Sequence, residues 1–172
     1  TATTSGQASG ELTGMKIAYV EIDTLLAQYN FCIDLNEGMV KKSENVRLTL
    51  NQKARELDKQ KQDFQTKYQN NAYLSPERAQ QEYNRIAKLE QDLQTLSNKL
   101  QSELMSENEK NSLQLRDSIN AFLKEYNKTK GYSMIISNTG FDNLLYADSI
   151  YNITKEIVEG LNARYSSPAP KK

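Results

Sequence analysis

Several residue types are scarce in this 172-residue chain, and each scarcity excludes a class of function. The chain contains no His, which excludes Ser-His-Asp and Cys-His catalysis and His-ligated metal sites. Its single Cys can form neither an intrachain disulfide nor a multi-Cys zinc site. The 22 basic and 22 acidic side chains balance, whereas a nucleic-acid-binding protein usually carries a basic excess. We therefore expect a non-enzymatic protein without a metal, a cofactor or a nucleic-acid partner.

Apolar residues are also few. They make up 37% of the chain, below the roughly 45–50% of a typical globular domain. The chain is too polar for a large spherical core, but its apolar residues recur regularly and its charges are mixed, which argues against disorder. This combination is typical of an elongated binding or scaffolding protein.

Gly and Pro are concentrated at the ends of the chain. The stretch between Gly38 and Pro76 contains neither residue, and the same holds between Pro76 and Gly131. Such stretches favour two long helices, because Pro breaks a helix interior and Gly weakens it. We expect the following divisions: a flexible N-terminal tail at 1–14, a β-rich base at 15–34 and 131–165, a helical hairpin arm at 35–130, and a flexible C-terminal tail at 166–172.

The ends of these helices carry recognisable signals. Residues 34–37 have the form of a capping box, which predicts a helix start near Leu35. Two consecutive Asn residues at 70–71 predict a turn, and Ser75 followed by Pro76 predicts the start of the second helix. Gly131 predicts its end.

The apolar stripe of the hairpin is narrow. Leucine and isoleucine repeat with coiled-coil spacing from Ile86 to Leu100, but the repeat is interrupted before Leu115. On the first helix, Lys53, Gln60 and Lys67 occupy positions of the seam. We therefore hypothesise that the arm is flexible, with joints near 100–115 and near the base.

Outside the hairpin the apolar period changes from that of a helix to that of a strand. We expect strands at 16–23, 132–137 and 144–147, with Asp23 as the N-cap of a short helix. A final amphipathic helix carries Ile153, Ile157, Leu161 and Tyr165 at i, i+4 spacing. The predicted fold class is α+β, with a small β-strand base and a long antiparallel coiled-coil hairpin. Such a small base usually requires oligomerisation.

Two segments carry a resemblance to a known family. The chain from about 15 to 165 resembles the Skp/OmpH family of periplasmic chaperones, most specifically in KIAYVEID followed by TLLAQY and in GYSMIISNTGFDNLLYADSIYNITKEIVEGL. The resemblance implies a homotrimer with a central strand barrel, whose arms hold unfolded outer-membrane β-barrel proteins without ATP and prevent their aggregation. The residues expected in this trimer base are Ile17, Tyr19, Val20, Tyr132, Met134, Ile136, Leu144 and Tyr146.

Two groups of residues on the hairpin are candidates for client binding. Apolar and aromatic side chains gather near the tip, at Phe64, Tyr68, Tyr73 and Leu74. For Phe64 and Leu74 we favour the simpler interpretation, in which Phe64 packs in the seam and Leu74 forms a hydrophobic staple with Ala79.

The second group is basic. Residues 38–73 carry eight basic and four acidic side chains. Members of the family that the chain resembles are often strongly basic, whereas this chain is neutral overall and keeps a basic bias only on this helix. The eight are Lys41, Lys42, Arg47, Lys53, Arg55, Lys59, Lys61 and Lys67. This face suits acidic client segments or a weak contact with a membrane surface, although a solvated helix face is the commoner explanation.

Cys32 is better interpreted as a small buried apolar residue than as a redox site.

The compartment is inferred indirectly. The chain begins with Thr, and we expect that a signal peptide has been removed and that the protein is periplasmic, with a lipid anchor conceivable on a segment outside this sequence. The alternative function is a non-catalytic coiled-coil scaffold of the envelope that binds one folded partner.

Overall fold

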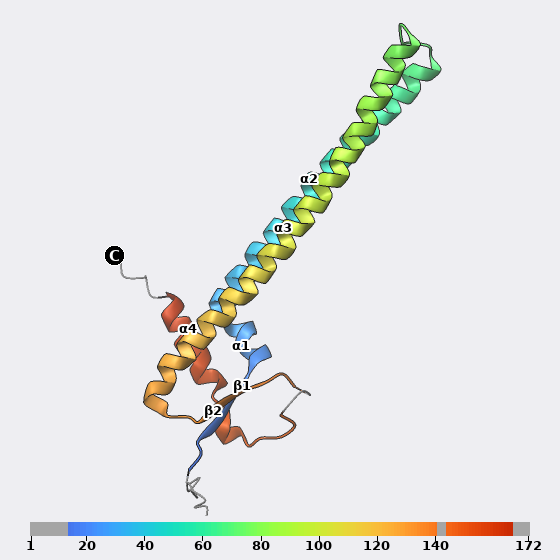
Figure 1. The fold of residues 1–172 in the computed structure, drawn as a ribbon. Coiled ribbons are helices and arrows are strands. Elements are labelled where there is room, and N and C mark those ends of the chain that lie inside the picture. Colours follow the sequence, from blue (N-terminus) through green and yellow to red (C-terminus); the bar gives the residue numbers. More distant parts are fainter. Residues whose placement is uncertain (1–13, 141–143, 167–172) are drawn as a thin grey trace, which may run out of the picture. The chain divides into compact units, whose positions relative to one another are not determined.

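The computed structural model describes residues 14–140 and 144–166, and the chain divides into two compact units. The hairpin unit spans Asp34–Gln114, and the strand unit comprises the chain before and after it. Figure 1 shows the elements in chain order: β1 (Ile17–Glu21), α1 (Ile22–Gln28), α2 (Asn30–Gln69), α3 (Pro76–Lys130), β2 (Met134–Asn138), the 3₁₀ turn η1 (Ser149–Tyr151) and α4 (Thr154–Ser166).

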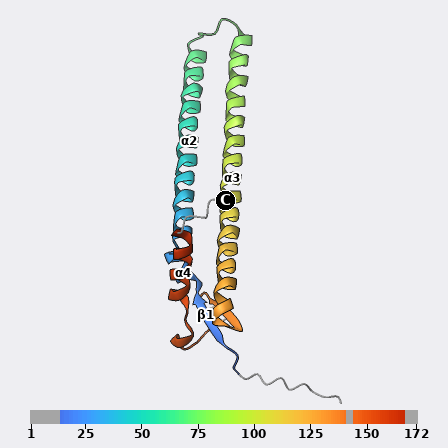
Figure 2. The same cartoon turned by 90° about the vertical axis from the view of Figure 1, so that its left-hand side faces the viewer.

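Two antiparallel helices form the hairpin unit. Within it, α2 and α3 lie side by side, as Figure 2 shows, and ion pairs join Lys42 to Glu107 and Lys61 to Glu90. The buried apolar side chains described in this unit are Leu57, Ala79 and Ile86. The seam is therefore thinly packed, as its polar intrusions predict.

The signals at the hairpin turn are confirmed. The helix α2 ends at Gln69, and Asn71 takes a left-handed backbone with φ 50°. The hydroxyl of Ser75 accepts a hydrogen bond from the Arg78 amide at 3.3 Å, as expected of an N-cap. Gly131 follows α3 with φ 69°, a conformation that favours glycine.

The strand unit is built on a two-stranded parallel sheet. β1 pairs with β2 in a register that places Ile17 opposite Met134 and Glu21 opposite Asn138. The predicted strands at 16–23 and 132–137 thus exist with slightly different bounds. The core of the strand unit consists of buried apolar residues from several elements: Ala18, Val20, Leu25, Tyr29, Cys32, Ile153, Ile157, Val158 and Leu161. The α+β class is confirmed, and Cys32 is buried as expected.

The predicted helix start near Leu35 is wrong. The helix α1 ends at Gln28, Tyr29 has an extended backbone, and α2 begins at Asn30. The side chain of Asn162 in α4 spans this break, because its Oδ1 accepts from the Asn30 amide at 2.8 Å and its Nδ2 donates to the Gln28 carbonyl at 2.9 Å. A contact from a residue more than 130 positions away thus satisfies the backbone there, which makes a local cap at Asp34 unnecessary.

Asp23 is not the N-cap of the short helix. The helix α1 begins one residue earlier, after Glu21, whose side chain makes no capping hydrogen bond. The Glu21 amide instead donates to the hydroxyl of Thr154 at 2.8 Å. A buried side chain at the start of α4 therefore binds the end of β1.

The predicted third strand at 144–147 is also wrong. These residues form no strand, and the carboxylate of Asp148 accepts from the Ile150 amide at 3.0 Å to start the turn η1. Side-chain capping by an Asp competes with strand pairing in this way. The middle of the C-terminal signature, 141–143, and the tails at 1–13 and 167–172 lie outside the described residues.

Candidate functional site

The tip of the hairpin unit carries a cluster of four aromatic rings. The ring of Phe64 lies at its centre, with centroid distances of 5.9 Å to Tyr68, 5.7 Å to Tyr73 and 6.2 Å to Tyr83. We call these four residues the tip cluster. Such contacts stabilise aromatic side chains beyond simple burial.

The turn positions the cluster. Two backbone amides of the turn donate hydrogen bonds to the last carbonyls of α2. The Asn71 amide donates to the Tyr68 carbonyl at 3.2 Å, and the Ala72 amide donates to the Lys67 carbonyl at 2.9 Å. The chain then reverses, so that Tyr73 lies against Phe64. Tyr83 comes from the facing helix α3, three residues before Ile86, a helical spacing that places it beside the seam.

Sequence reasoning therefore found three of the four rings and missed Tyr83, although its spacing from Ile86 was a usable signal. Phe64 is half-buried and packs as expected. The hydrophobic staple is wrong, because the side chain of Leu74 is 88% exposed and does not pack.

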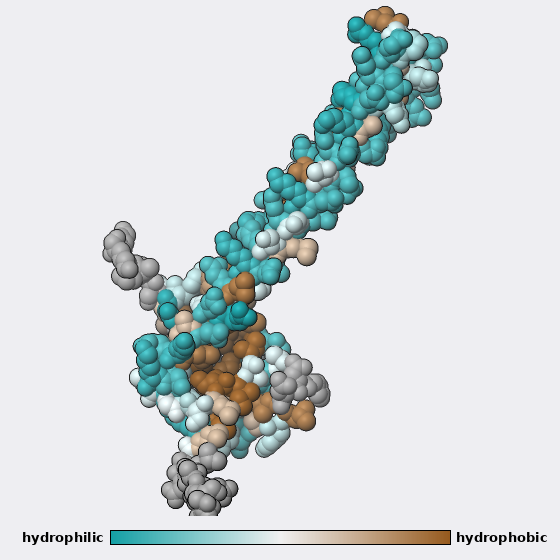
Figure 3. Space-filling view, in the orientation of Figure 1, coloured by the Kyte–Doolittle hydropathy of each residue, from teal (hydrophilic) through white to brown (hydrophobic). Residues whose placement is uncertain are grey.

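Part of the tip cluster opens onto a groove of about 380 Å³. Its lining residues are Phe64, Tyr68, Pro76, Ala79, Gln80 and Tyr83. Tyr68 and Tyr83 are 63% and 58% exposed. Figure 3 shows a small hydrophobic group at this tip on an otherwise mostly hydrophilic hairpin surface. The tip thus presents aromatic surface to solvent, a feature typical of interaction sites.

Charged groups of α3 adjoin the tip cluster. Arg85 and Glu82 form an ion pair at 2.6 Å, and the hydrogen bond from Arg85 lowers the pKa of the Glu82 carboxyl. Desolvation, followed by the charge of Glu82, raises the pKa of the Tyr73 hydroxyl. The shift moves the Tyr73 hydroxyl further from ionisation, and a neutral phenol can both donate and accept a hydrogen bond.

Salt bridges neutralise part of the basic face of α2. Lys42 pairs with Glu107, Arg47 with Glu44 at 2.5 Å, and Lys61 with Glu90 at 2.8 Å. In the part of the chain that the structure describes, the remaining five cations have no ion-pair partner: Lys41, Lys53, Arg55, Lys59 and Lys67. Three of these five, with Leu48, border an open groove along α2.

The described residues contain neither a candidate membrane span nor a candidate metal site. No described helix combines the length and the apolar character needed to cross a membrane. Over the same residues, acidic and Cys side chains form no group of three or more that is placed to hold a metal ion.

Comparisons with known proteins place this geometry in a family. The family model for OmpH-like outer membrane proteins matches residues 16–161, which is most of the chain. The chain belongs to the OmpH-like family. A comparison with curated proteins finds no match.

A solved structure shares the fold. It is the crystal structure of an OmpH-like protein from Caulobacter crescentus CB15, named as a candidate outer membrane chaperone. The TM-score is 0.78 at 12% identity, and the match covers 97% of this chain and 95% of that one. At this identity the likeness concerns the fold.

In this OmpH-like chain, the residues expected in a trimer base fall into two groups. Tyr19 and Val20 are buried inside the strand unit of the single chain, whereas Met134 and Tyr146 are 50% and 84% exposed. The other four are half-buried: Ile17, Tyr132, Ile136 and Leu144. Sequence reasoning missed Leu145 and Ile150, which are 82% and 76% exposed.

Proposed function

We propose that this OmpH-like protein is an ATP-independent holdase chaperone of the periplasm. It binds unfolded outer-membrane β-barrel proteins and prevents their aggregation. The observation that carries this proposal is the family match over residues 16–161, together with the name of the structurally similar Caulobacter crescentus protein. The protein acts by binding, not by catalysis.

The tip cluster is the proposed contact for apolar client segments. Two of its rings are more than half exposed, and Leu74 beside them is almost fully exposed. An unfolded β-barrel protein offers many apolar and aromatic side chains, since such barrels carry an outward apolar band with aromatic girdles. Aromatic rings with polar hydroxyls bind such segments with little loss of conformational entropy.

The unpaired cations of α2 are the proposed contact for acidic client segments. Five basic side chains of α2 form no ion pair within the described residues, and all five are exposed. Exposed charges attract a partner over about 8–10 Å at physiological salt. Since the whole chain has no net charge, this steering is weak and salt-sensitive, and any contact with an anionic membrane surface is equally weak.

We further propose that three copies assemble through the strand units. The exposed apolar side chains of this unit include Met134, Leu145, Tyr146 and Ile150. Several large apolar side chains exposed on one small unit favour a subunit interface there. Arms from three copies would then surround one client, so that several weak contacts act together.

An aggregation assay tests the proposed function. Several unrelated β-barrel membrane proteins are diluted from urea with and without the chaperone, and light scattering is followed. We expect suppression for all of them, and about a tenfold weaker effect when Tyr68 and Tyr83 are both replaced by Ser. Met105→Ser is the matched control, because Met105 is 75% exposed in the same unit but lies outside the tip cluster. Binding to one folded protein, with no effect on unfolded barrels, would instead identify a scaffold.

A further inference from the structure

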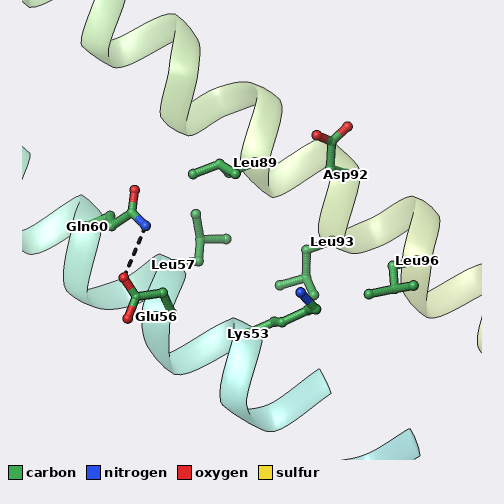
Figure 4. Close-up of a pocket in the computed structure, with 8 residues that line it drawn as sticks. All are labelled: Lys53, Glu56, Leu57, Gln60, Leu89, Asp92, Leu93 and Leu96. Atoms are coloured by element: carbon green, nitrogen blue, oxygen red, sulfur yellow. Dashed lines mark hydrogen bonds between the residues drawn. The ribbon is translucent and has the colours of Figure 1, made fainter. Parts of the chain in front are cut away.

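A second pocket lies within the seam of the hairpin unit. Its volume is about 200 Å³, and its lining residues are Lys53, Glu56, Leu57, Gln60, Leu89, Asp92, Leu93 and Leu96. Figure 4 shows the four leucines, one from α2 and three from α3, between the two helices. We call this space the seam pocket. None of the residues of the tip cluster lines it.

The polar intrusions in the seam explain why the pocket exists. Leu57 is buried, but the neighbouring seam positions on α2 are Lys53, which is exposed, and Gln60, which is half-buried. Neither side chain covers the facing leucines with apolar surface, as a residue at a seam position normally does. The three leucines of α3 thus face α2 without full apolar cover.

Gln60 also leaves a hydrogen-bond acceptor unused. Its Nε2 donates to Glu56 at 3.2 Å, which fixes the orientation of the amide, because the reverse assignment would place two oxygens together. Its Oε1 is shielded from solvent and accepts no hydrogen bond from any described residue. In Figure 4 the amide nitrogen of Gln60 faces Glu56, and this oxygen points away from Glu56. Buried polar atoms without a partner are rare, so a group that donates a hydrogen bond there would be favoured.

We propose that the seam pocket holds one aromatic side chain of a client, and tyrosine in preference to phenylalanine. An apolar cavity of about 150 Å³ is large enough to bind benzene, so the seam pocket can hold a phenol ring among its leucines. A small rotation of the Gln60 amide presents Oε1 to the phenol hydroxyl, which donates to it. The aromatic girdles of β-barrel membrane proteins supply such side chains. This inference rests on the proposed function for the identity of the client.

The proposal is tested by nuclear magnetic resonance on the full chain with labelled leucine methyl groups. The probes are N-acetyl-tyrosinamide and N-acetyl-phenylalaninamide, each titrated alone. We expect shifts at the methyl groups of Leu57, Leu89, Leu93 and Leu96, and binding of the tyrosine probe about three- to tenfold tighter, as one additional hydrogen bond gives. Shifts confined to the methyl groups of Leu74, next to the tip cluster, or no shifts at the four pocket leucines, would overturn the proposal.

Three variants separate the parts of the site. Gln60→Leu removes the acceptor and should abolish the preference for tyrosine, whereas Gln62→Leu on an exposed position of the same helix should leave it unchanged. Leu93→Phe should fill the pocket and remove binding of both probes. If circular dichroism shows that Leu93→Phe unfolds the hairpin, the comparison of Gln60→Leu with Gln62→Leu still tests whether Gln60 is responsible for the tyrosine preference. A tyrosine preference that survives Gln60→Leu contradicts the role of Gln60.

The aggregation assay keeps the two proposals distinguishable. If the chain suppresses aggregation but the leucine methyl groups do not respond to the probes, the seam pocket is not a subsite and the chaperone function stands. If the probes bind at the leucines but no β-barrel protein is protected, the chaperone function fails and the pocket remains a binding site for phenols.

Discussion

Gly160 of α4 lies directly against the ring of Phe122 of α3. A Cβ atom added to Gly160 would lie 2.3 Å from Cζ and 2.9 Å from Cε2 of that ring. Both residues belong to the strand unit, and Phe122 packs against its core. The absence of a side chain at Gly160 therefore sets how closely α4 approaches α3.

Gly160→Ala should destabilise the protein. The added methyl group forces the Phe122 ring or α4 to move, and overpacking of this kind costs about 1–3 kcal/mol. Urea unfolding followed by circular dichroism measures the change. Gly38→Ala is the control, because Gly38 lies within α2 with no neighbouring atom within 4 Å of the added Cβ. That change should stabilise the helix by up to about 1 kcal/mol. Equal effects of both substitutions would show that Gly160 is not a tight contact.

Asn162→Ala should weaken the break between α1 and α2. Its two hydrogen bonds, to Asn30 and Gln28, are lost, and at about 0.5–1.5 kcal/mol each the expected cost is about 1–3 kcal/mol. Hydrogen exchange should show faster exchange at the Asn30 amide in particular. The exposed Asn45 of α2 provides the control, since Asn45→Ala should have almost no effect. An unchanged Asn30 exchange rate would contradict the bridging role.

The ion pair between Lys130 and Glu156 makes a small pH-dependent contribution to stability. Their side chains approach to 2.6 Å, and the hydrogen bond from Lys130 lowers the pKa of Glu156. A carboxyl with a lowered pKa stabilises the fold above its ordinary pKa, about 4.3, and loses this contribution as the pH falls through the lowered value. The hydrogen bond to Glu156 also raises the pKa of Lys130, so its contribution is full below the ordinary lysine value and is lost at higher pH.

Glu156→Gln tests this pair. Both side chains are more than a third exposed, so the effect is small and screened by salt. We expect the variant to be slightly less stable than the unmodified protein at pH 7, with the difference disappearing below about pH 4. A difference that persists at low pH would mean that packing of the side chain, not its charge, is responsible.

Gln60→Leu should stabilise the hairpin unit. The substitution removes the unpaired Oε1 and adds apolar contact in the seam, which together contribute about 1–2 kcal/mol. Lys67→Leu is the comparison, because Lys67 is exposed and its replacement should change stability little.

In the unmodified chain, we expect the backbone amides of residues 64–89 to exchange hydrogen faster than those of residues 17–22. Equal protection of the two segments would contradict the flexible-arm hypothesis.

Replacement of exposed apolar residues in the strand unit should prevent assembly. The double substitution of Tyr146 and Ile150 by Lys introduces like charges into the proposed interface, while Met105→Lys in the hairpin unit serves as control. Light scattering coupled to size exclusion should give the mass of three chains for the control and of one chain for the double variant. A monomeric unmodified protein at micromolar concentration would exclude the trimer.

Features that depend only on neighbouring residues could be predicted from the amino-acid sequence. Long stretches without Gly or Pro led to two long helices, and Ser75, Pro76 and Gly131 marked their ends, because capping and backbone freedom act within a few residues. The aromatic residues near the turn predicted most of the tip cluster for the same reason. The resemblance of the segments at both ends of the chain indicated the family.

Tertiary contacts decided the rest. The helix α2 begins at Asn30, and not at the predicted Leu35, because the side chain of Asn162 accepts a hydrogen bond from the Asn30 amide. The hydroxyl of Thr154 likewise accepts from the Glu21 amide at the end of β1. Both hydrogen bonds join residues more than 130 positions apart. The pairing of α2 with α3 brought Tyr83 onto Phe64 and left Gln60 without a partner for its oxygen. Such contacts depend on which segments meet in space, and local propensity carries no information about that.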